Sequence, residues 1–558
     1  MGVAISGTEA DLVFTGGKVR TPVHPSGFAR ALAVRDGLIQ AVGTDGDIRP
    51  LAGRGTRVVD LRGRLVLPAF GDAHVHAVSG GLESLRCNLL GLRTRQDTLA
   101  AVAAYCSGLS AGAWVLGGGW AMEAFPGGLP TVADLDAVTG GRPAFLPNYA
   151  HHSAWVNTAA LQRAGIDAGT PDPPDGRIER DQAGRPAGTL HDGAMRLVQV
   201  PAPSPADLRA GLLAAQAHLH SLGITRFQDA CIGAAAEIGM PDTFESYRQA
   251  AEDGVLTCHV TGALWWDRRR GLDQVEDLLA RREQAGGRFR ASTVKVMLDG
   301  VCETFTAAMS APYLDRHGHP AGHRGSLFIE PDLLDAAARR LADEGFQLHF
   351  HAIGDRAVGT ALDTLASLPA TGRRAARHHV AHLQFIAPRD LGRFLALDAV
   401  ANFQPLWACT EPLMEQMTLP FIGPERAAWQ YQIGSLARMG TRIAFGSDWP
   451  ISSADPLQEI HVAVNRVLSE RLGQRGEPEC ESPFLPGQAV SLDDALGAFT
   501  SGVDWVNHEE NLVGTLRPGL RADLIVLDQD LFAVPPGAIG QVSVVMTVSS
   551  GQVVFGDL

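Results

Sequence analysis

The stretch LVLPAFGDAHVH (residues 65–76) decides the fold, because an apolar run ends there in closely spaced polar side chains. Seven later runs repeat this pattern and are separated by helical stretches; they lie at 223–230, 256–264, 292–300, 346–355, 377–384, 398–406 and 441–450. Short apolar strands that alternate with helices are typical of a parallel sheet. Eight such units predict an α/β protein with a TIM (β/α)₈ barrel, whose polar residues gather at the carboxyl ends of the strands.

Both ends of the chain show a different pattern, in which short strand-like runs are joined by turns. Asp36-Gly37 lies inside ALAVRDGLIQAVG, and Ser550-Gly551 lies inside SVVMTVSSGQVVF. Such pairs between apolar runs predict β-hairpins. We therefore expect a small β-sandwich built from both termini, with residues 1–63 and 512–558 in it and residues 64–511 in the barrel domain.

The gap between the first and second runs of the barrel pattern is much longer than the later gaps. A βα crossover needs only a few tens of residues, whereas this gap extends from residue 76 to residue 223. We therefore expect an inserted segment after the first barrel strand, at about 82–205, which covers the barrel mouth.

Composition excludes several classes of protein and partner. The 558 residues include 61 acidic and 47 basic side chains, a net charge of −14, and no run of Lys or Arg stands out, so we expect no nucleic-acid partner. No window approaches the ~18 apolar residues of a membrane span, and the N-terminus does not resemble a signal peptide, so we expect a cytoplasmic protein without a membrane partner. The seven cysteines form no C-x-x-C pair, which argues against a thiolate zinc site. The composition does not decide whether the chain forms a homo-oligomer.

Histidines end three of the predicted barrel strands. His74 and His76 are two residues apart, so in a strand both imidazoles emerge on one face and can bind one ion. A lone H-x-H motif is weak evidence, but its place at the mouth of the first barrel strand favours metal binding. The runs at 346–355 and 377–384 add further candidates, which are His349, His351, His378, His379 and His382.

Alternation along a strand does not choose among these five histidines. The histidine nearer the carboxyl end of each run can best reach an ion at the mouth, which favours His351 and His382. We interpret His349, His378 and His379 as residues that orient the ligands, pack in the core or lie on the surface.

Two further side chains are candidate metal ligands. Lys295 lies inside the apolar run STVKVMLDG, where a cation is costly unless it is neutralised. Carbamylation by CO₂ would make it an anionic bridge between two cations, although its head could instead simply reach the polar end of the barrel. Asp448 ends the last run, where it can bind a metal and accept a proton, or cap a turn. Comparable strand ends carry Asp72, Asp299 and Asp355.

Together, these segments resemble the amidohydrolase superfamily, and more narrowly amidohydrolase family 3 in its N-substituted formamide deformylase-like branch, over about residues 10–556. The matching motifs are, in chain order, PAFGDAHVH, KVMLDGVCETFTAAMSAPY, HAIGD, the segment ending at His382, and FGSDWP. In the insert, GGGWAMEAFPGGLPTVADLD and HHSAWVNTAALQRAGI resemble the segment that covers the site in this family.

The resemblance implies a set of site residues. It implies one divalent ion on His74 and His76, a second on His351 and His382, carbamylated Lys295 as their bridge, and Asp448 as ligand and proton acceptor. The site could hold one ion or two, and Zn²⁺ is the default for such ligands. Two insert positions are expected to face the substrate, namely Trp120 and His152.

The resemblance also implies an activity. We expect a small-molecule substrate, an N-substituted formamide or another N-acyl amine, whose C–N bond is cleaved by a hydroxide that the metal activates. No organic cofactor is implied. Two alternatives stay open, a deaminase or other hydrolase of the same superfamily, and a catalytically inactive scaffold.

Overall fold

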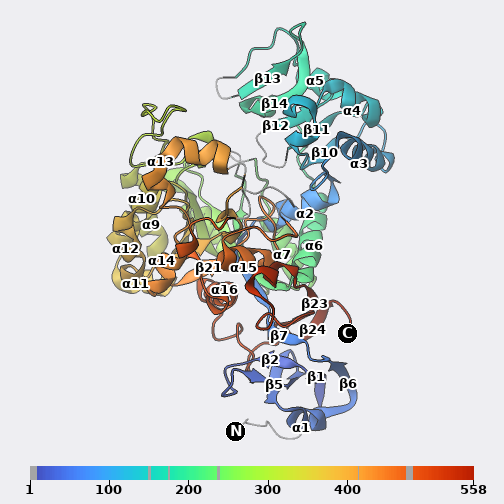
Figure 1. The fold of residues 1–558 in the computed structure, drawn as a ribbon, viewed down its shortest axis with the longest axis vertical. Coiled ribbons are helices and arrows are strands. Elements are labelled where there is room, and N and C mark those ends of the chain that lie inside the picture. The colour runs from blue at the N-terminus through green and yellow to red at the C-terminus, as the bar shows by residue number, and fades with distance from the viewer. Residues whose placement is uncertain (1–8, 149–152, 174–175, 236–238, 412–413, 473–481) are drawn as a thin grey trace. The chain divides into compact units, whose positions relative to one another are not determined.

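A computed structural model describes the chain except for residues 1–8, 149–152, 174–175, 236–238, 412–413 and 473–481 (Figure 1). The chain divides into two compact units. The larger unit comprises Met1–His76 and Gln216–Leu558, and the smaller comprises Ala77–Ala215. The predicted insert therefore corresponds to a unit that begins slightly earlier and ends slightly later than residues 82–205.

The larger unit is built around a sheet of eight parallel strands. Its strands are β8 (Phe70–Val75), β15 (Ile224–Ile232), β16 (His259–Trp265), β17 (Phe289–Met297), β18 (Gln347–Ala352), β19 (His379–His382), β20 (Val400–Phe403) and β21 (Ile443–Phe445). Neighbouring strands follow chain order from β8 to β21. All nine residues of β15 are buried, as expected for a parallel strand covered on both faces.

Backbone hydrogen bonds join the segments that follow the first and last barrel strands. Asp448 donates its N–H to the carbonyl of His74 at 2.7 Å, and His76 donates to the carbonyl of Trp449 at 2.9 Å. The result is a nearly closed barrel, which confirms the predicted TIM-type fold. Each of the eight predicted runs overlaps one strand of this barrel.

Amphipathic helices connect the barrel strands. In α9, for example, the buried residues Leu334, Ala337, Ala338 and Leu341 recur at the helical spacing of one face. The α-helices from α6 onward are α6 (Pro205–Ser221), α7 (Phe244–Glu252), α8 (Val275–Gln284), α9 (Pro331–Asp343), α10 (Asp355–Ser367), α11 (Ala370–Ala376), α12 (Leu391–Ala396), α13 (Leu419–Ala427), α14 (Ile433–Arg438), α15 (Pro456–Asn465), α16 (Leu492–Ala498) and α17 (Ser501–Val506).

Two more sheets of the larger unit contain strands from the ends of the chain. The four-stranded sheet has the order β5-β4-β1-β6, and the six-stranded sheet has the order β24-β23-β22-β7-β2-β3. Their elements are β1 (Ala10–Thr15), β2 (Lys18–Arg20), β3 (Phe28–Ala29), β4 (Ala31–Arg35), β5 (Leu38–Gly43), α1 (Asp45–Ile48), β6 (Ala52–Asp60), β7 (Leu65–Pro68), β22 (Leu524–Leu527), β23 (Val544–Ser549) and β24 (Gln552–Phe555). Side chains of both sheets, among them Phe14, Leu32, Val66 and Met546, share one hydrophobic cluster.

The two predicted hairpins are confirmed, but one predicted boundary is wrong. β4 and β5 pair across Asp36-Gly37, and β23 and β24 pair across Ser550-Gly551. β7 pairs with β22, with Val66 opposite Val526, so residues 65–68 belong to the six-stranded sheet and the barrel begins at β8 instead of residue 64. The sequence hides this break because two apolar strands follow each other almost directly.

The smaller unit has its own sheet and its own hydrophobic clusters. The strand order is β13-β14-β12-β11-β10-β9. Its elements are α2 (Ala77–Leu85), β9 (Cys87–Asn88), α3 (Arg95–Ser107), β10 (Val115–Gly118), α4 (Val132–Thr139), β11 (Ala144–Pro147), β12 (Ser153–Val156), α5 (Thr158–Ala164), β13 (Gly176–Arg180) and β14 (Pro186–Asp192). Among the described residues of the whole chain, no helix is long and apolar enough to span a membrane.

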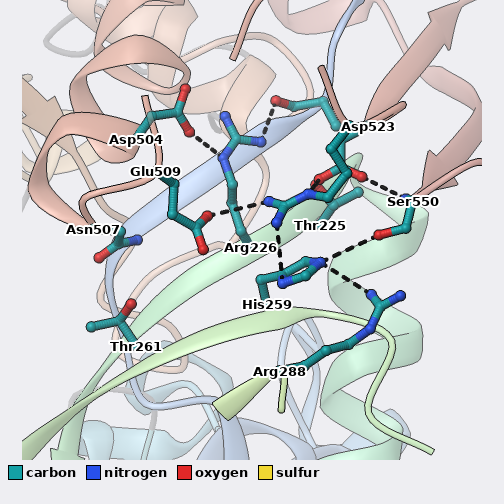
Figure 2. Close-up of polar contacts among 12 residues, drawn as sticks. Thr225, Arg226, His259, Thr261, Arg288, Asp504, Asn507, Glu509, Asp523 and Ser550 are labelled. Carbon is teal, nitrogen blue, oxygen red and sulfur yellow. Dashed lines mark hydrogen bonds and ion pairs between the residues drawn. The ribbon is translucent and has the colours of Figure 1, made fainter. Parts of the chain in front are cut away.

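Buried charges join the amino-terminal ends of the barrel strands to segments from the C-terminal part of the chain (Figure 2). Arg226 on β15 pairs with Asp504 on α17. Arg521 pairs with Asp523 at 3.0 Å and with Glu509 at 3.3 Å. We call these five residues the base network. Each of its cations faces a carboxylate, so the loss of one partner would leave an uncompensated buried charge at the base of the barrel.

Candidate metal centre

Polar side chains from the first and last barrel strands meet because the two strands approach very closely. A Cβ added to Gly446 would lie only 2.4 Å from the backbone nitrogen of His74, so a larger residue does not fit there. The buried carboxylate of Asp72 accepts hydrogen bonds from the N–H of His74 at 2.9 Å and from the hydroxyl of Ser447 at 2.6 Å. Asp72 therefore fixes the position of His74 relative to the residue that precedes Asp448.

Asp448 lies among three of the predicted histidine ligands. Its Oδ1 is 3.1 Å from His76 Nε2 and 3.3 Å from His74 Nε2, and its Oδ2 is 3.9 Å from His382 Nδ1. Ligand atoms of His74, His382 and Asp448 all lie within 4.8 Å of one another. His382 and Asp448 have positive φ angles of 77° and 57°, which are uncommon for non-glycine residues and typical of functional sites.

His351 lies beside this group, and a carboxylate supports it. Its ring centroid is 4.4 Å from that of His382, and its Nδ1 is 3.3 Å from Asp299 Oδ1. The carboxylate of Asp299 also accepts hydrogen bonds from the backbone N–H groups of Ile353, Gly354 and Ala308. Asp299 is therefore placed to orient His351, as carboxylates commonly orient metal-binding histidines.

Lys295 reaches the same centre from β17. Its Nζ is 3.3 Å from His74 Nε2 and 3.4 Å from His349 Nε2. The structure thus brings the six predicted ligands together at the carboxyl ends of barrel strands. His74, His382 and Asp448 form one close group, His76 and Lys295 lie beside it, and the ring of His351 lies next to that of His382.

Comparison with known proteins gives a consistent assignment. A family model described as "Amidohydrolase family" matches residues 57–555. The chain belongs to the amidohydrolase family. This membership confirms the resemblance stated from the motifs and makes the chain a hydrolase of the amidohydrolase superfamily.

Individual relatives of the family are distant but align over nearly the whole chain. Protein LONG AFTER FAR-RED 3 of Arabidopsis thaliana is 30% identical over 535 residues, which cover 94% of this chain and 88% of the relative. N-substituted formamide deformylase of Arthrobacter pascens is 27% identical over 566 residues, with 97% of both chains covered. An uncharacterized metal-dependent hydrolase from Pyrococcus horikoshii OT3 has a TM-score of 0.73 at 23% identity, covering 94% of this chain and 99% of its own, and shows the fold alone.

The charge states of the centre fit a divalent cation. Burial lowers the pKa of His74 to about 3, and the nearby Lys295 adds to this effect, so the imidazole is neutral. Burial opposes ionisation of Asp448, but its contacts with His74 and His76 outweigh that effect and hold its pKa well below the usual value. Among the described residues, the buried His382 Nδ1 has no hydrogen-bond partner. Neutral imidazoles around a buried carboxylate are the donor set that Zn²⁺ prefers.

Burial also changes the chemistry of Lys295. It lowers the pKa of the amine from 10.5 to about 7, although the nearby Asp448 acts in the opposite direction. A large fraction of the amine is therefore unprotonated near neutral pH. An unprotonated amine is the form that reacts with CO₂.

The three remaining histidines are buried, so none lies on the surface. His349 Nε2 is 2.9 Å from His74 Nδ1, which makes His349 the support of a predicted ligand. The ring of His379 lies 4.0 Å from that of His349, and His378 Nδ1 accepts the backbone N–H of Leu348 at 2.9 Å. The sequence reading left the roles of these three residues open.

The predicted substrate contacts receive less support than the ligands. Trp120 is fully buried in a hydrophobic cluster of the smaller unit, where its indole N–H donates to the carbonyl of Leu146 at 2.7 Å. These contacts are those of a core residue. His152 lies outside the described residues. The sequence analysis missed Gln228, whose Oε1 lies 2.7 Å from His349 Nδ1 and whose only signal was a polar residue within an apolar strand.

Proposed function

We propose that this chain is a metal-dependent amidohydrolase that cleaves the amide-type C–N bond of a small N-acyl amine, such as an N-substituted formamide. The convergence of His74, His76 and His382 on ionised Asp448, at the carboxyl end of the barrel, carries the proposal. The relative named N-substituted formamide deformylase, which aligns over 97% of both chains, supports the substrate class.

The predicted ligands would hold one or two Zn²⁺ ions. His74 and His76 would hold one ion, His351 and His382 the second, and a carbamylated Lys295 would bridge them. When bound, such an ion supplies a water that is acidic enough to react at neutral pH and a positive charge that polarises the substrate carbonyl.

Lys295 can form the carbamate without another protein base. Its unprotonated Nζ attacks the carbon of CO₂, an N–C bond forms, and one proton leaves to solvent. The product is an anion, which removes the cost of a buried lysine charge beside two metal ions.

Asp448 has the position and charge of a proton carrier. Its carboxylate takes the proton that the attacking water loses when the water oxygen bonds to the carbonyl carbon. The same carboxyl group then donates that proton to the amide nitrogen as the C–N bond breaks, because an amine leaves poorly as an anion. Water and amide thus yield a carboxylic acid and an amine.

A substrate screen tests the proposed function. Purified protein of known zinc content would be incubated with N-substituted formamides, the matching acetamides and N-acyl amino acids, and the released amine would be measured. We expect amine release that a chelator abolishes and added zinc restores. Release of ammonia from ring amines instead would indicate a deaminase, and no turnover of any amide by the zinc-loaded protein would contradict the proposal.

A further inference from the structure

A chain of hydrogen bonds runs through the barrel interior to His74, and its direction is set at its start. The amide Nε2 of Gln347 lies 2.9 Å from the backbone carbonyl of Arg377 and 2.8 Å from that of Val506. Both partners can only accept, so this atom of Gln347 must be the NH₂ group. The other amide atom of Gln347 is therefore the oxygen.

Gln228 continues the chain with a fixed orientation. Its Nε2 donates to Gln347 Oε1 at 3.1 Å and to Asn507 Oδ1 at 3.1 Å. Because the Gln347 atom is an acceptor, the facing atom of Gln228 is its NH₂ group, and the remaining atom is the carbonyl oxygen. That oxygen lies 2.7 Å from His349 Nδ1, so this nitrogen of His349 must carry a proton.

His349 carries no second proton. It is fully buried, and its described contacts are Gln228, His74, His379 and Lys295, none of which is a carboxylate. A buried imidazolium without a counter-ion is costly, so His349 Nε2 keeps its lone pair. The His74 Nδ1 that faces it at 2.9 Å must then donate a proton.

This order leaves His74 Nε2 as the nitrogen that faces the centre. It lies 3.3 Å from Asp448 Oδ1, so without an ion it can donate a proton to this carboxylate, and with an ion bound its lone pair can take the place of that proton. Lys295 Nζ, whose ammonium form has only donors, lies 3.4 Å from His349 Nε2, which agrees with a lone pair on that nitrogen.

We propose that Gln228 is a positioning residue that acts through His349 to hold His74 in the Nδ1-protonated tautomer, with its Nε2 ready to bind the cation. The inference rests on the proposed function for the identity of the cation site. Its physical consequence is that the ligand is prepared before the ion arrives. Supporting residues of this kind typically contribute ~10–100-fold to metal affinity.

Neutron diffraction on deuterated, metal-free crystals tests the tautomers directly. We expect deuterium on Nδ1 of both His349 and His74, and none on Nε2 of His349. Without an ion, coordination cannot impose this pattern, so the hydrogen-bond chain must produce it. Deuterium on Nε2 of His349 would overturn the inference, whether or not the protein hydrolyses any amide.

Zinc affinity in matched variants tests the consequence. Gln228→Met keeps the length of the side chain but removes the acceptor, and we expect zinc binding, measured by competition with a chelator, to weaken ~10–100-fold. Thr293→Val is the control, because the equally buried hydroxyl of Thr293 donates to the same Gln347 oxygen at 2.8 Å but is not needed to orient that amide. Its zinc affinity should stay within about threefold of the wild-type value.

The outcomes of this comparison are decisive in both directions. Equal losses of affinity in both variants, with both proteins folded by circular dichroism, would show a packing effect and overturn the inference. If Gln228→Met does not fold, the neutron map of the wild-type protein decides. A wild-type protein that binds zinc but releases no amine would contradict the proposed function and leave the positioning role intact.

Discussion

The two ends of the barrel bury polar side chains in opposite ways. At the base, each cation of the base network faces a carboxylate, as Arg226 faces Asp504. At the mouth, three histidines lie around the single carboxylate of Asp448, and His74 Nε2 is 3.3 Å from its Oδ1. The base thus pairs its arginines with carboxylates, whereas the mouth gathers side chains that suit a bound cation. This difference agrees with the general rule that barrel enzymes place stability at one end and chemistry at the other.

The largest expected effect is at the mouth, in Asp448→Asn. The amide is nearly isosteric but neither carries the charge nor takes up the proton, so we expect kcat for amine release to fall ~10³-fold or more. Zinc content and circular dichroism would show whether the fold and the centre survive. Turnover near the wild-type rate would remove Asp448 from the proton-transfer role.

At the base, Arg226→Met should affect stability rather than chemistry. The substitution leaves Asp504 buried without its cation, which typically costs ~3–5 kcal/mol. Urea unfolding at constant zinc load would measure this loss, and kcat per folded molecule should stay near the wild-type value. Arg20→Met is the control, because the Arg20–Asp493 pair is largely exposed and should contribute less than ~1 kcal/mol. Similar losses of unfolding free energy in both variants would show that the buried Arg226–Asp504 pair stabilises the fold no more than the exposed pair does.

At the mouth, Lys295→Ala should have a smaller effect, on the zinc content of the protein. We expect fewer zinc ions per chain, because a bridging anion is lost, and partial recovery of bound zinc with added short carboxylic acids. Metal analysis after gel filtration measures both. The surface substitution Lys18→Ala should leave zinc content unchanged. Unchanged zinc in Lys295→Ala would count against carbamylation.

The sequence predicted the mouth far better than the base. The barrel could be predicted because apolar runs that end in polar side chains recur along the chain. The same pattern made the histidines and Asp448 candidates, whereas the full set of six ligands, with Lys295 inside its run, came from the family resemblance. Gln228 and Asp72 could not be assigned, because side chains in strands buried on both faces show no alternation that tells a network from packing. Arg226 and Asp504 are 278 residues apart in the chain, and nothing local to either residue predicts their pairing.

The break between β7 and β8 shows that sequence patterns also fail to assign whole strands to a sheet. Hydrophobicity identifies residues 65–75 as strand-like, but it carries no information on which sheet each half joins. That choice depends on β22, which supplies the partner of Val66 from far along the chain. Long-range pairing therefore decides where the barrel begins, which the local pattern cannot show.

The smallest expected effect is a pH dependence at the base. Burial, aided by the neighbouring Arg521, lowers the pKa of His259 from 6.5 to about 3. Between these values the unfolded chain binds a proton that the folded protein does not, so stability rises with pH in this window and is lost as pH falls from 6.5 towards 3. His259→Asn removes this term, so acidification from pH 7 to pH 5 should cost the variant about 2 kcal/mol less than the wild type. Urea unfolding at both pH values measures the difference, and parallel losses in the two proteins would show that His259 is protonated in the folded base.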